Sequence, residues 1–241
     1  MIVGGSGSFF GTDTADRVTN RSTMTGDVLL GDGDDVLDGR GGLFNGQFFG
    51  GNGNDRMELR GAGPVPDTIF GDSGVDTILG TDGGDTIQGE GSDVPFGKVG
   101  IDLLLGGNGD DALDGGTGRD TLLGGSGDDT FAGGAGGDLM TGGQGRDTFL
   151  FVAATHFGTL AGNRDRIADF TARADLIDLT VVDANSNVAS DQAFAFVGAA
   201  AFSNLAGQLR YLVVDRLLQG DTNGDGWRIF RRSSRHCPRC R

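Results

Sequence analysis

The strongest constraint on this chain is a run of five nine-residue units that fills residues 106–150. Each unit fits the pattern G-G-x-G-x-D-x-U-x, in which U is a bulky apolar residue. A period of nine matches neither the 3.6-residue period of a helix nor the two-residue alternation of a long strand. It is the period of a β-solenoid of the calcium-binding kind, so the array predicts an all-β, repetitive fold.

These units resemble the repeats-in-toxin (RTX) family of secreted calcium-binding proteins. The resemblance implies a parallel β-roll, in which a tight G-G-x-G-x-D turn precedes a short strand, two units make one coil, and U points into a thin core. Paired glycines allow positive φ and close approach of neighbouring backbones. Turn carbonyls and aspartates of adjacent coils would offer the all-oxygen ligation that Ca²⁺ prefers. We therefore expect an all-β, parallel β-roll solenoid of nonapeptide repeats with a C-terminal β-rich cap.

The candidate ligands of several Ca²⁺ ions are the turn residues of these units. In the regular array they are the second and fourth positions and the aspartate at the sixth: Gly107, Gly109, Asp111, Gly116, Gly118, Asp120, Gly125, Gly127, Asp129, Gly134, Gly136, Asp138, Gly143, Gly145 and Asp147. Upstream units place further aspartates in the same register, namely Asp35, Asp55, Asp76, Asp85, Asp93 and Asp102. Pro95 occupies the core position of an eight-residue unit, which predicts a local defect there.

The pattern divides the chain into four segments. Residues 1–70 contain degenerate repeats with insertions, and the insertion that holds Pro64 and Pro66 is expected to be a loop, because proline removes a ladder donor. Residues 71–150 form the regular RTX β-roll. Residues 151–227 lose the glycine phasing and contain short apolar runs, which we expect to form strands that cap the last coil. Residues 228–241 are a basic tail.

After the repeats come the segments D-x-I-x-D-F at 165–170 and D-x-I-D-L at 175–179. With the repeats, they are similar to the C-terminal domain of serralysin-type secreted metalloproteases, over residues 71–226. The resemblance implies an extracellular protein that leaves through type I secretion machinery on an uncleaved C-terminal signal. Beyond Gly226 the chain departs from the family's usual ending. We interpret the basic tail as the product of a frameshift, which would remove that signal.

Composition argues against several other classes of protein. The formal net charge of −15 would repel nucleic acid and anionic membranes and attract divalent cations. No apolar run reaches the roughly 18 residues of a membrane span, and no cleavable secretory signal opens the sequence. Cys237 and Cys240 lie in the basic tail, so we expect no disulfide framework, and C-x-x-C alone offers too few ligands for zinc.

Catalytic motifs are not visible in the sequence. His156 and His236 are not part of an H-E-x-x-H motif, and neither a G-x-S-x-G elbow nor a P-loop is present. We therefore expect a calcium-binding module that supports secretion and folding without a catalytic site of its own. Two alternatives stay open. In the first, the chain, which begins within the repeat pattern, is a C-terminal fragment of a secreted serralysin-like metalloprotease or other hydrolase whose catalytic domain is missing. In the second, it is a structural or adhesive surface protein.

A second type of calcium motif stands near the end of the predicted cap. The run DTNGDG at 221–226 supplies Asp221, Asn223 and Asp225, the first half of an EF-hand-like loop. Arg232 occupies the twelfth position, where such a loop carries an acidic ligand. A single weak Ca²⁺ site and a plain polar turn are both compatible with this run.

Overall fold

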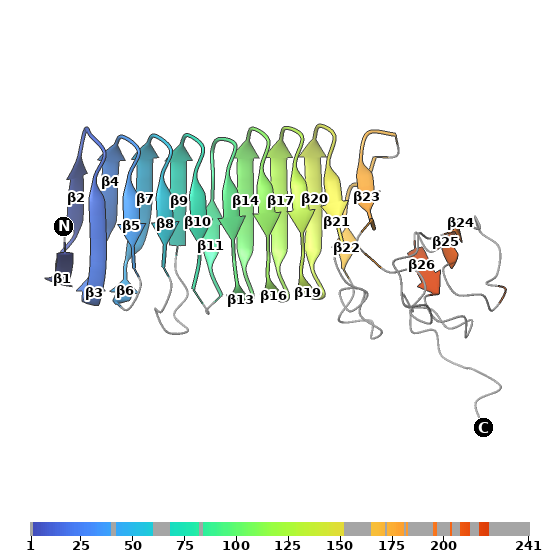
Figure 1. The fold of residues 1–241 in the computed structure, drawn as a ribbon, viewed down its shortest axis with the longest axis horizontal. Helices are drawn as coiled ribbons and strands as arrows, with labels where there is room; N and C mark the ends of the chain where they lie inside the picture. The colour runs from blue at the N-terminus through green and yellow to red at the C-terminus, as the bar shows by residue number, and fades with distance from the viewer. Residues whose placement is uncertain are drawn as a thin grey trace, which may run out of the picture. The chain divides into compact units, whose positions relative to one another are not determined.

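The computed structural model describes residues 2–39, 42–59, 68–81, 84–151, 165–171, 173–180 and 182, together with the short segments 195–196, 203, 208–212 and 217–221. Every regular element in this described part is a β-strand (Figure 1). No helix in it is long and apolar enough to cross a membrane. The all-β, parallel solenoid expected from the repeats is confirmed.

Two long parallel sheets build the roll, and all their neighbouring strands pair in parallel. The 11-stranded sheet has the spatial order β1 (Ile2–Ser6), β3 (Arg17–Thr25), β5 (Val36–Asp38), β8 (Arg56–Glu58), β10 (Thr77–Leu79), β12 (Val94–Phe96), β15 (Ala112–Asp114), β18 (Thr130–Ala132), β21 (Thr148–Leu150) and β23 (Leu176–Asp178), with β6 (Leu43–Asn45) beside β3. The 9-stranded sheet has the order β2 (Phe9–Thr12), β4 (Val28–Asp32), β7 (Gln47–Asn52), β9 (Thr68–Ser73), β11 (Thr86–Gln88), β14 (Leu103–Asn108), β17 (Thr121–Ser126), β20 (Leu139–Gln144) and β22 (Arg166–Ile167).

Two smaller sheets complete the described structure. One contains β13 (Val99–Gly100), β16 (Thr117–Gly118) and β19 (Ala135–Gly136), which pair in parallel within the turns of successive coils. The other contains β24 (Ala195–Phe196), β25 (Gln208–Leu212) and β26 (Leu217–Asp221), and its last pair is antiparallel.

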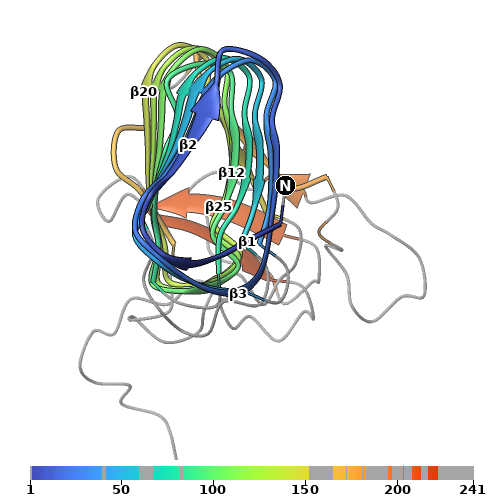
Figure 2. The ribbon, with the colours of Figure 1, turned by 90° about the vertical axis from the view of Figure 1, so that its left-hand side faces the viewer.

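Two nonapeptide units make one coil, as the resemblance implied. Leu104 of β14 lies opposite Leu122 of β17, which lies opposite Met140 of β20. Between the two members of each pair the chain passes once through the 11-stranded sheet, along β15 and then β18. Seen along the stacking direction, successive coils lie behind one another, with β2 and β20 on one side and β12 on the other (Figure 2).

The core is a double row of inward side chains, one from each sheet. Leu104, Leu122 and Met140 come from one sheet, and Leu113, Phe131 and Phe149 come from the other, each with no more than 1% of its surface exposed. The rings of Phe131 and Phe149, one coil apart, stack with centroids 5.0 Å apart. Since the core is thin, each coil buries few apolar side chains, and hydrophobic burial alone contributes little stability per coil.

The degenerate first segment folds as part of the same roll. Its turn aspartates are separated by 19, 20 and 21 residues, from Asp16 through Asp35 and Asp55 to Asp76. In the regular array the separation is 18 residues. The extra residues lie where the chain passes from the 11-stranded to the 9-stranded sheet, for example between Leu37 and Phe48. The proline-containing insertion at 60–67 lies outside the described residues.

Pro95 produces the local defect that the sequence predicts. Strand β12, which contains buried Pro95, pairs with β15 only at Phe96 and Asp114. The next pair in the same sheet, β15 with β18, is joined at three positions. Proline has no N–H to donate, so the ladder is shortened at this coil.

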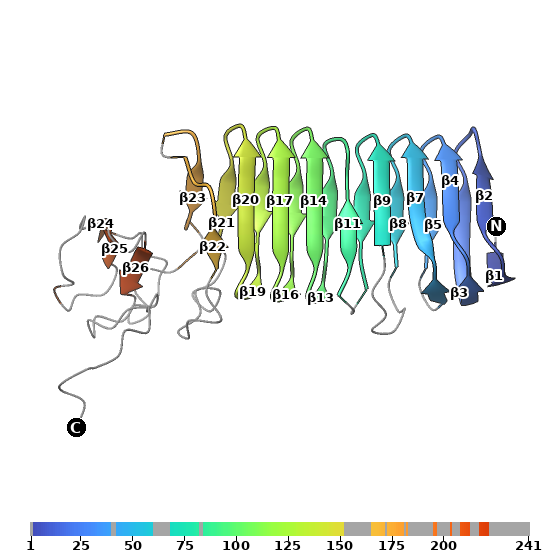
Figure 3. The ribbon, with the colours of Figure 1, turned by 180° about the vertical axis from the view of Figure 1, so that it is seen from behind.

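The roll continues past Leu150. Strand β22 pairs with β20, and β23 pairs with β21, so residues Arg166–Asp178 add a further coil to both sheets. Figure 3 shows the opposite side of the roll, with β4, β7, β9, β11, β14, β17 and β20 of the 9-stranded sheet in order. One compact unit comprises Met1–Leu150 with Arg166–Asp178, and the second comprises Phe151–Asp165 with Leu179–Arg241.

Candidate metal centre

The turn aspartates form two columns, one along each edge of the roll. In each column the backbone N–H of one aspartate donates to the Oδ1 of the aspartate in the next coil. The first column contains Asp16, Asp35, Asp55, Asp76, Asp93, Asp111, Asp129, Asp147 and Asp175, with N···O distances of 2.6 to 3.2 Å. The second contains Asp85, Asp102, Asp120 and Asp138, with distances of 2.7 to 2.9 Å.

Stacking buries these carboxylates and leaves one oxygen of many of them without a hydrogen bond. Each predicted turn aspartate from Asp35 to Asp147 has at most 2% of its surface exposed. Among the described residues, Oδ2 is buried without a hydrogen-bond partner in Asp35, Asp55, Asp76, Asp102, Asp111, Asp120 and Asp129. A buried polar atom without a partner costs free energy, and an anionic one costs more. These oxygens therefore fit a bound cation.

Because glycine at the first turn position has no side chain, Oδ2 of the turn aspartate projects into the space beside it. A Cβ added to Gly115 would lie 2.7 Å from Oδ2 of Asp120 and 2.7 Å from the carbonyl oxygen of Gly133 in the next coil. At Gly106 the same space is bounded by Oδ2 of Asp111 and the carbonyl oxygen of Gly124. A carboxylate of one coil and a carbonyl of the next thus converge on one small space. Both are hard oxygen donors, which suit Ca²⁺.

Burial raises the pKa of eight column aspartates. The pKa rises to about 7 in Asp76, Asp111 and Asp120 and to about 6 in Asp55, Asp102 and Asp129, with burial as the largest cause. The hydrogen bond from the preceding aspartate's N–H lowers each pKa in part, and neighbouring carboxylates raise it further. The pKa values of Asp35 and Asp147 are also raised, for the same first cause.

Main-chain oxygens must complete any ion's coordination in this part of the chain. Among the described residues, no three His, Cys, Asp or Glu side chains gather as a metal cluster would require. The predicted turn glycines adopt the positive φ that brings backbones together: Gly107, Gly109, Gly116, Gly118, Gly125, Gly127, Gly134, Gly143 and Gly145. Gly136 does not, but its Cβ would collide with the carbonyl of Gly118, so close approach still requires glycine.

Two predicted ligands have a second oxygen that already accepts hydrogen bonds. Oδ2 of Asp85 accepts the N–H of Thr81 at 2.7 Å. Oδ2 of Asp93 accepts the N–H groups of Glu90 and Gly91 at 2.8 and 3.1 Å. The sequence reading did not separate these two from the other aspartates. The available signal was a threonine at the second turn position for Asp85, and a turn shortened by one residue for Asp93.

The sequence pattern did not predict that two aspartates of the last coil, Asp169 and Asp175, accept hydrogen bonds from the repeats. Asp169 accepts the N–H groups of Gly142 and Gly143, both at 2.9 Å, and Asp175 accepts the N–H of Asp147 at 3.2 Å. Both lie in the segments that follow the repeats. Of the EF-hand-like run, only Asp221 is described, as the last residue of β26, and Asn223 and Asp225 lie outside the described residues.

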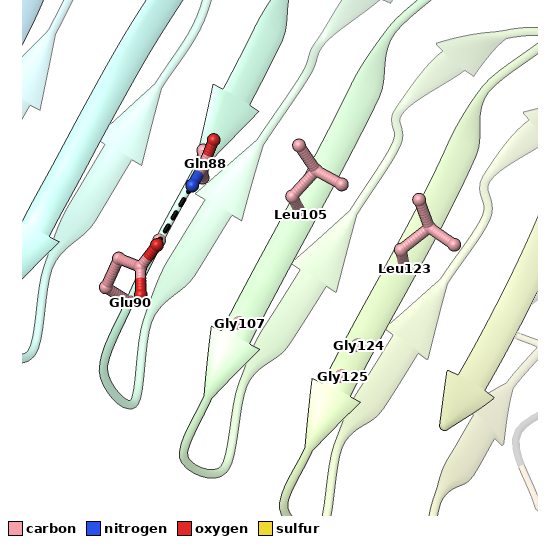
Figure 4. A pocket seen from close by; sticks show the side chains of 8 residues that line it. Gln88, Glu90, Leu105, Gly107, Leu123, Gly124 and Gly125 are labelled. Atoms are coloured by element: carbon pink, nitrogen blue, oxygen red, sulfur yellow. Dashed lines mark hydrogen bonds between the residues drawn. The ribbon is translucent and has the colours of Figure 1, made fainter. Parts of the chain in front are cut away.

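A shallow hollow lies on the outer face of the 9-stranded sheet, with a volume of about 370 Å³ (Figure 4). Its side chains are Gln88, Glu90, Leu105 and Leu123, and the Gln88 amide donates to the Glu90 carboxylate at 2.9 Å. Its remaining lining residues are glycines. This lining offers neither a nucleophile nor a pair of titratable groups, so we assign it no chemistry.

Comparison with protein families identifies the repeats. The model of the RTX calcium-binding nonapeptide repeat matches residues 66–87, 88–122 and 114–149. No curated protein matches the chain. The matched residues hold most of the two aspartate columns. Five of the seven unpartnered Oδ2 atoms, those of Asp76, Asp102, Asp111, Asp120 and Asp129, lie in this calcium-binding repeat region, and those of Asp35 and Asp55 precede it.

Proposed function

We propose that this protein, an RTX β-roll whose nonapeptide repeats bind calcium, is a module that folds when calcium is available and is unfolded when it is not. One observation carries the proposal: in seven buried aspartates of the two columns, Asp35, Asp55, Asp76, Asp102, Asp111, Asp120 and Asp129, Oδ2 has no hydrogen-bond partner in the described part of the chain. The ligands would be these Oδ2 atoms together with turn carbonyls such as that of Gly124.

Electrostatics makes folding depend on a cation. Carboxylates on adjacent coils about 5 Å apart repel by roughly 3 kcal/mol per pair at an effective dielectric constant of 20. Ordering a glycine-rich chain also costs about 1–2 kcal/mol per residue in backbone entropy. A core that is one side chain deep per sheet offsets little of either cost. Bound calcium supplies the positive charge that turns the repulsion between coils into attraction.

The concentration of calcium then decides the state of the chain. Extracellular calcium modules bind at about 10⁻⁴–10⁻³ M. At ten times the dissociation constant each ion stabilises the fold by about 1.4 kcal/mol, whereas at sub-micromolar calcium the contribution is close to zero. We propose that the chain is unfolded and exportable inside the cell and folds outside it. The RTX repeats, which are typical of secreted proteins, and the net charge of −15 support this.

We also propose a role for each segment of the chain. Residues 1–70 and 71–150 would form the degenerate and the regular parts of the roll. Residues 151–227, apart from the further coil at Arg166–Asp178, would serve as its cap. The roll would support type I secretion and folding of a secreted protein. The repeats themselves are structural and not catalytic. A hydrolase domain encoded upstream would make the chain part of a secreted enzyme, and an H-E-x-x-H motif in that upstream sequence would identify it.

Circular dichroism with and without calcium tests the proposal. In excess chelator we expect a spectrum of an unfolded chain, and millimolar Ca²⁺ should produce the β spectrum cooperatively. The double variant Asp111→Asn/Asp129→Asn should need several-fold more calcium, because two buried ligand charges are lost. Asp13→Asn, an exposed aspartate outside the columns, should behave as the unaltered protein does. A full β spectrum in chelator would overturn the proposal.

A further inference from the structure

The second residue of each turn divides the turns into two kinds. In most turns this residue has positive φ: Gly31, Gly51, Asp72, Lys98, Gly107, Gly116, Gly125, Gly134 and Gly143. Seven of the aspartates four residues later, from Asp35 to Asp129, have an Oδ2 without a hydrogen-bond partner. The strand pairing also extends into some of these turns, as between Gly107 and Gly125. We call these the open turns.

Three turns have threonine at the second position and are closed by it. Thr81 is fully buried, donates its N–H to Oδ2 of Asp85 at 2.7 Å and places its hydroxyl 3.0 Å from Oδ1 and 3.2 Å from Oδ2. Thr12 donates its N–H and its hydroxyl to Oδ2 of Asp16 at 2.8 and 2.9 Å. Thr171 donates its N–H to Oδ2 of Asp175 at 2.6 Å.

Two closed turns stand at the ends of the first aspartate column, and the third opens the described part of the second. Asp16 and Asp175 are the first and last members of the first column, and Asp85 is the first described member of the second. An end turn has a coil with a matching turn on one side only, so it cannot offer oxygens from two coils on both of its faces. Donors from its own turn can satisfy the carboxylate there, because a threonine supplies an N–H and an O–H.

We propose that threonine at the second turn position closes a turn to calcium, so that Thr12 and Thr171 terminate the first calcium column and Thr81 closes the first described turn of the second. The inference rests on the proposed function and reduces the number of residues proposed to bind calcium. Oδ2 of Asp85 is then not a calcium ligand. Inside the first column, Oδ2 of Asp93 accepts two N–H groups of the shortened turn, so we exclude it as a calcium ligand in the same way.

Calcium stoichiometry, measured by titration calorimetry and by metal analysis after dialysis, tests the proposal. Thr81→Gly removes the hydroxyl and permits positive φ, so the variant should bind one more ion per chain. Thr81→Ser retains both donors and should match the unaltered protein. At the open turn of Asp76, Asp72→Thr should lose one ion, because a β-branched residue disfavours positive φ. Asp72→Gly, which removes the same carboxylate but keeps positive φ accessible, should lose none.

A crystal structure of the full chain grown in calcium gives an independent readout from anomalous scattering. Ions should lie beside the turns of Asp111, Asp120 and Asp129, with none held by Oδ2 of Asp85. An ion on Oδ2 of Asp85, or unchanged stoichiometry in both Thr81→Gly and Asp72→Thr, would overturn the inference while leaving the proposed function intact. Absence of calcium binding in the unaltered protein would instead overturn the proposed function.

Discussion

The backbone N–H of Asp111 donates a hydrogen bond of 2.9 Å to Oδ1 of Asp129, one coil further along the roll. The same bond recurs through both columns, so each carboxylate is oriented by its neighbour's backbone and only its second oxygen faces the space between turns. Each aspartate therefore has two separable roles. Oδ1 orders the stack, and Oδ2 carries the charge that a cation must balance.

Removing a charge while retaining Oδ1 should separate these roles. In Asp120→Asn the amide oxygen can still accept the N–H of Asp102, which lies 2.9 Å from Oδ1 in the native turn. We expect calcium affinity to fall about tenfold, or about 1.4 kcal/mol, because a ligand charge is lost. In chelator the variant should be less destabilised than the native chain, since burial of that charge is avoided. Calorimetry with calcium and osmolyte-induced folding in chelator measure the two effects, and a loss in both would contradict the assignment.

The response to pH should reverse when calcium is added. In the roll without metal, burial raises the pKa of Asp111 and Asp120 from 3.8 to about 7. A raised pKa stabilises the fold below about pH 4, and this contribution is lost as pH rises through 6 to 7. In chelator the unfolded chain should thus need less of a stabilising osmolyte to fold at pH 5 than at pH 8, as followed by circular dichroism. With saturating calcium the roll should be more stable at pH 8, because ligands must be deprotonated to bind.

Proton release gives a direct measurement of the same competition. In an osmolyte such as sucrose, at a concentration that folds the calcium-free roll, calcium added at pH 6.5 in weak buffer should release protons. The release should become small at pH 8.5, where Asp76, Asp111 and Asp120, with pKa values of about 7, are already ionised. Magnesium, which is smaller and dehydrates reluctantly, should release fewer protons at equal concentration. Equal proton release at the two pH values would contradict the raised pKa values.

A methyl group at the first turn position should block calcium without straining the backbone. Gly115 does not have the left-handed φ that favours glycine, but its Cβ would lie 2.7 Å from both Asp120 Oδ2 and the Gly133 carbonyl. We expect Gly115→Ala to lose about 1–3 kcal/mol of stability in calcium, the usual cost of overpacking. Gly7→Ala, with a φ of 132° but no atom near the new Cβ, measures backbone strain alone. Equal losses in urea unfolding would show that space in the turn is unimportant.

Two neighbouring leucines should differ in their effect on the calcium midpoint. Leu122 points inward and is fully buried, whereas Leu123 points outward and lines the surface hollow of Figure 4. Leu122→Ala should cost about 2–5 kcal/mol and raise the calcium concentration needed for folding. Leu123→Ala should cost less, because part of its side chain is already in contact with water. Calcium titrations followed by circular dichroism would detect a reversal of this order.

Local sequence determined the repeated elements of this protein. The nine-residue period specified turn and strand, the apolar position identified core residues such as Leu122 and Phe131, and Pro95 marked the shortened ladder. These properties belong to a single unit, because a turn's conformation and the direction of its next side chains depend on adjacent residues.

Tertiary stacking decided the rest. It joined Asp16 and Asp175 to the column of the regular repeats, and it placed Arg166–Asp178 as a further coil. It also left Oδ2 of Asp111 without a hydrogen-bond partner, while the same atom of Asp85 is occupied by Thr81. Two aspartates in the same sequence pattern can differ in this way because a carboxylate's burial and its donors depend on the adjacent coils and on the φ of its own turn, which the nine-residue period does not specify.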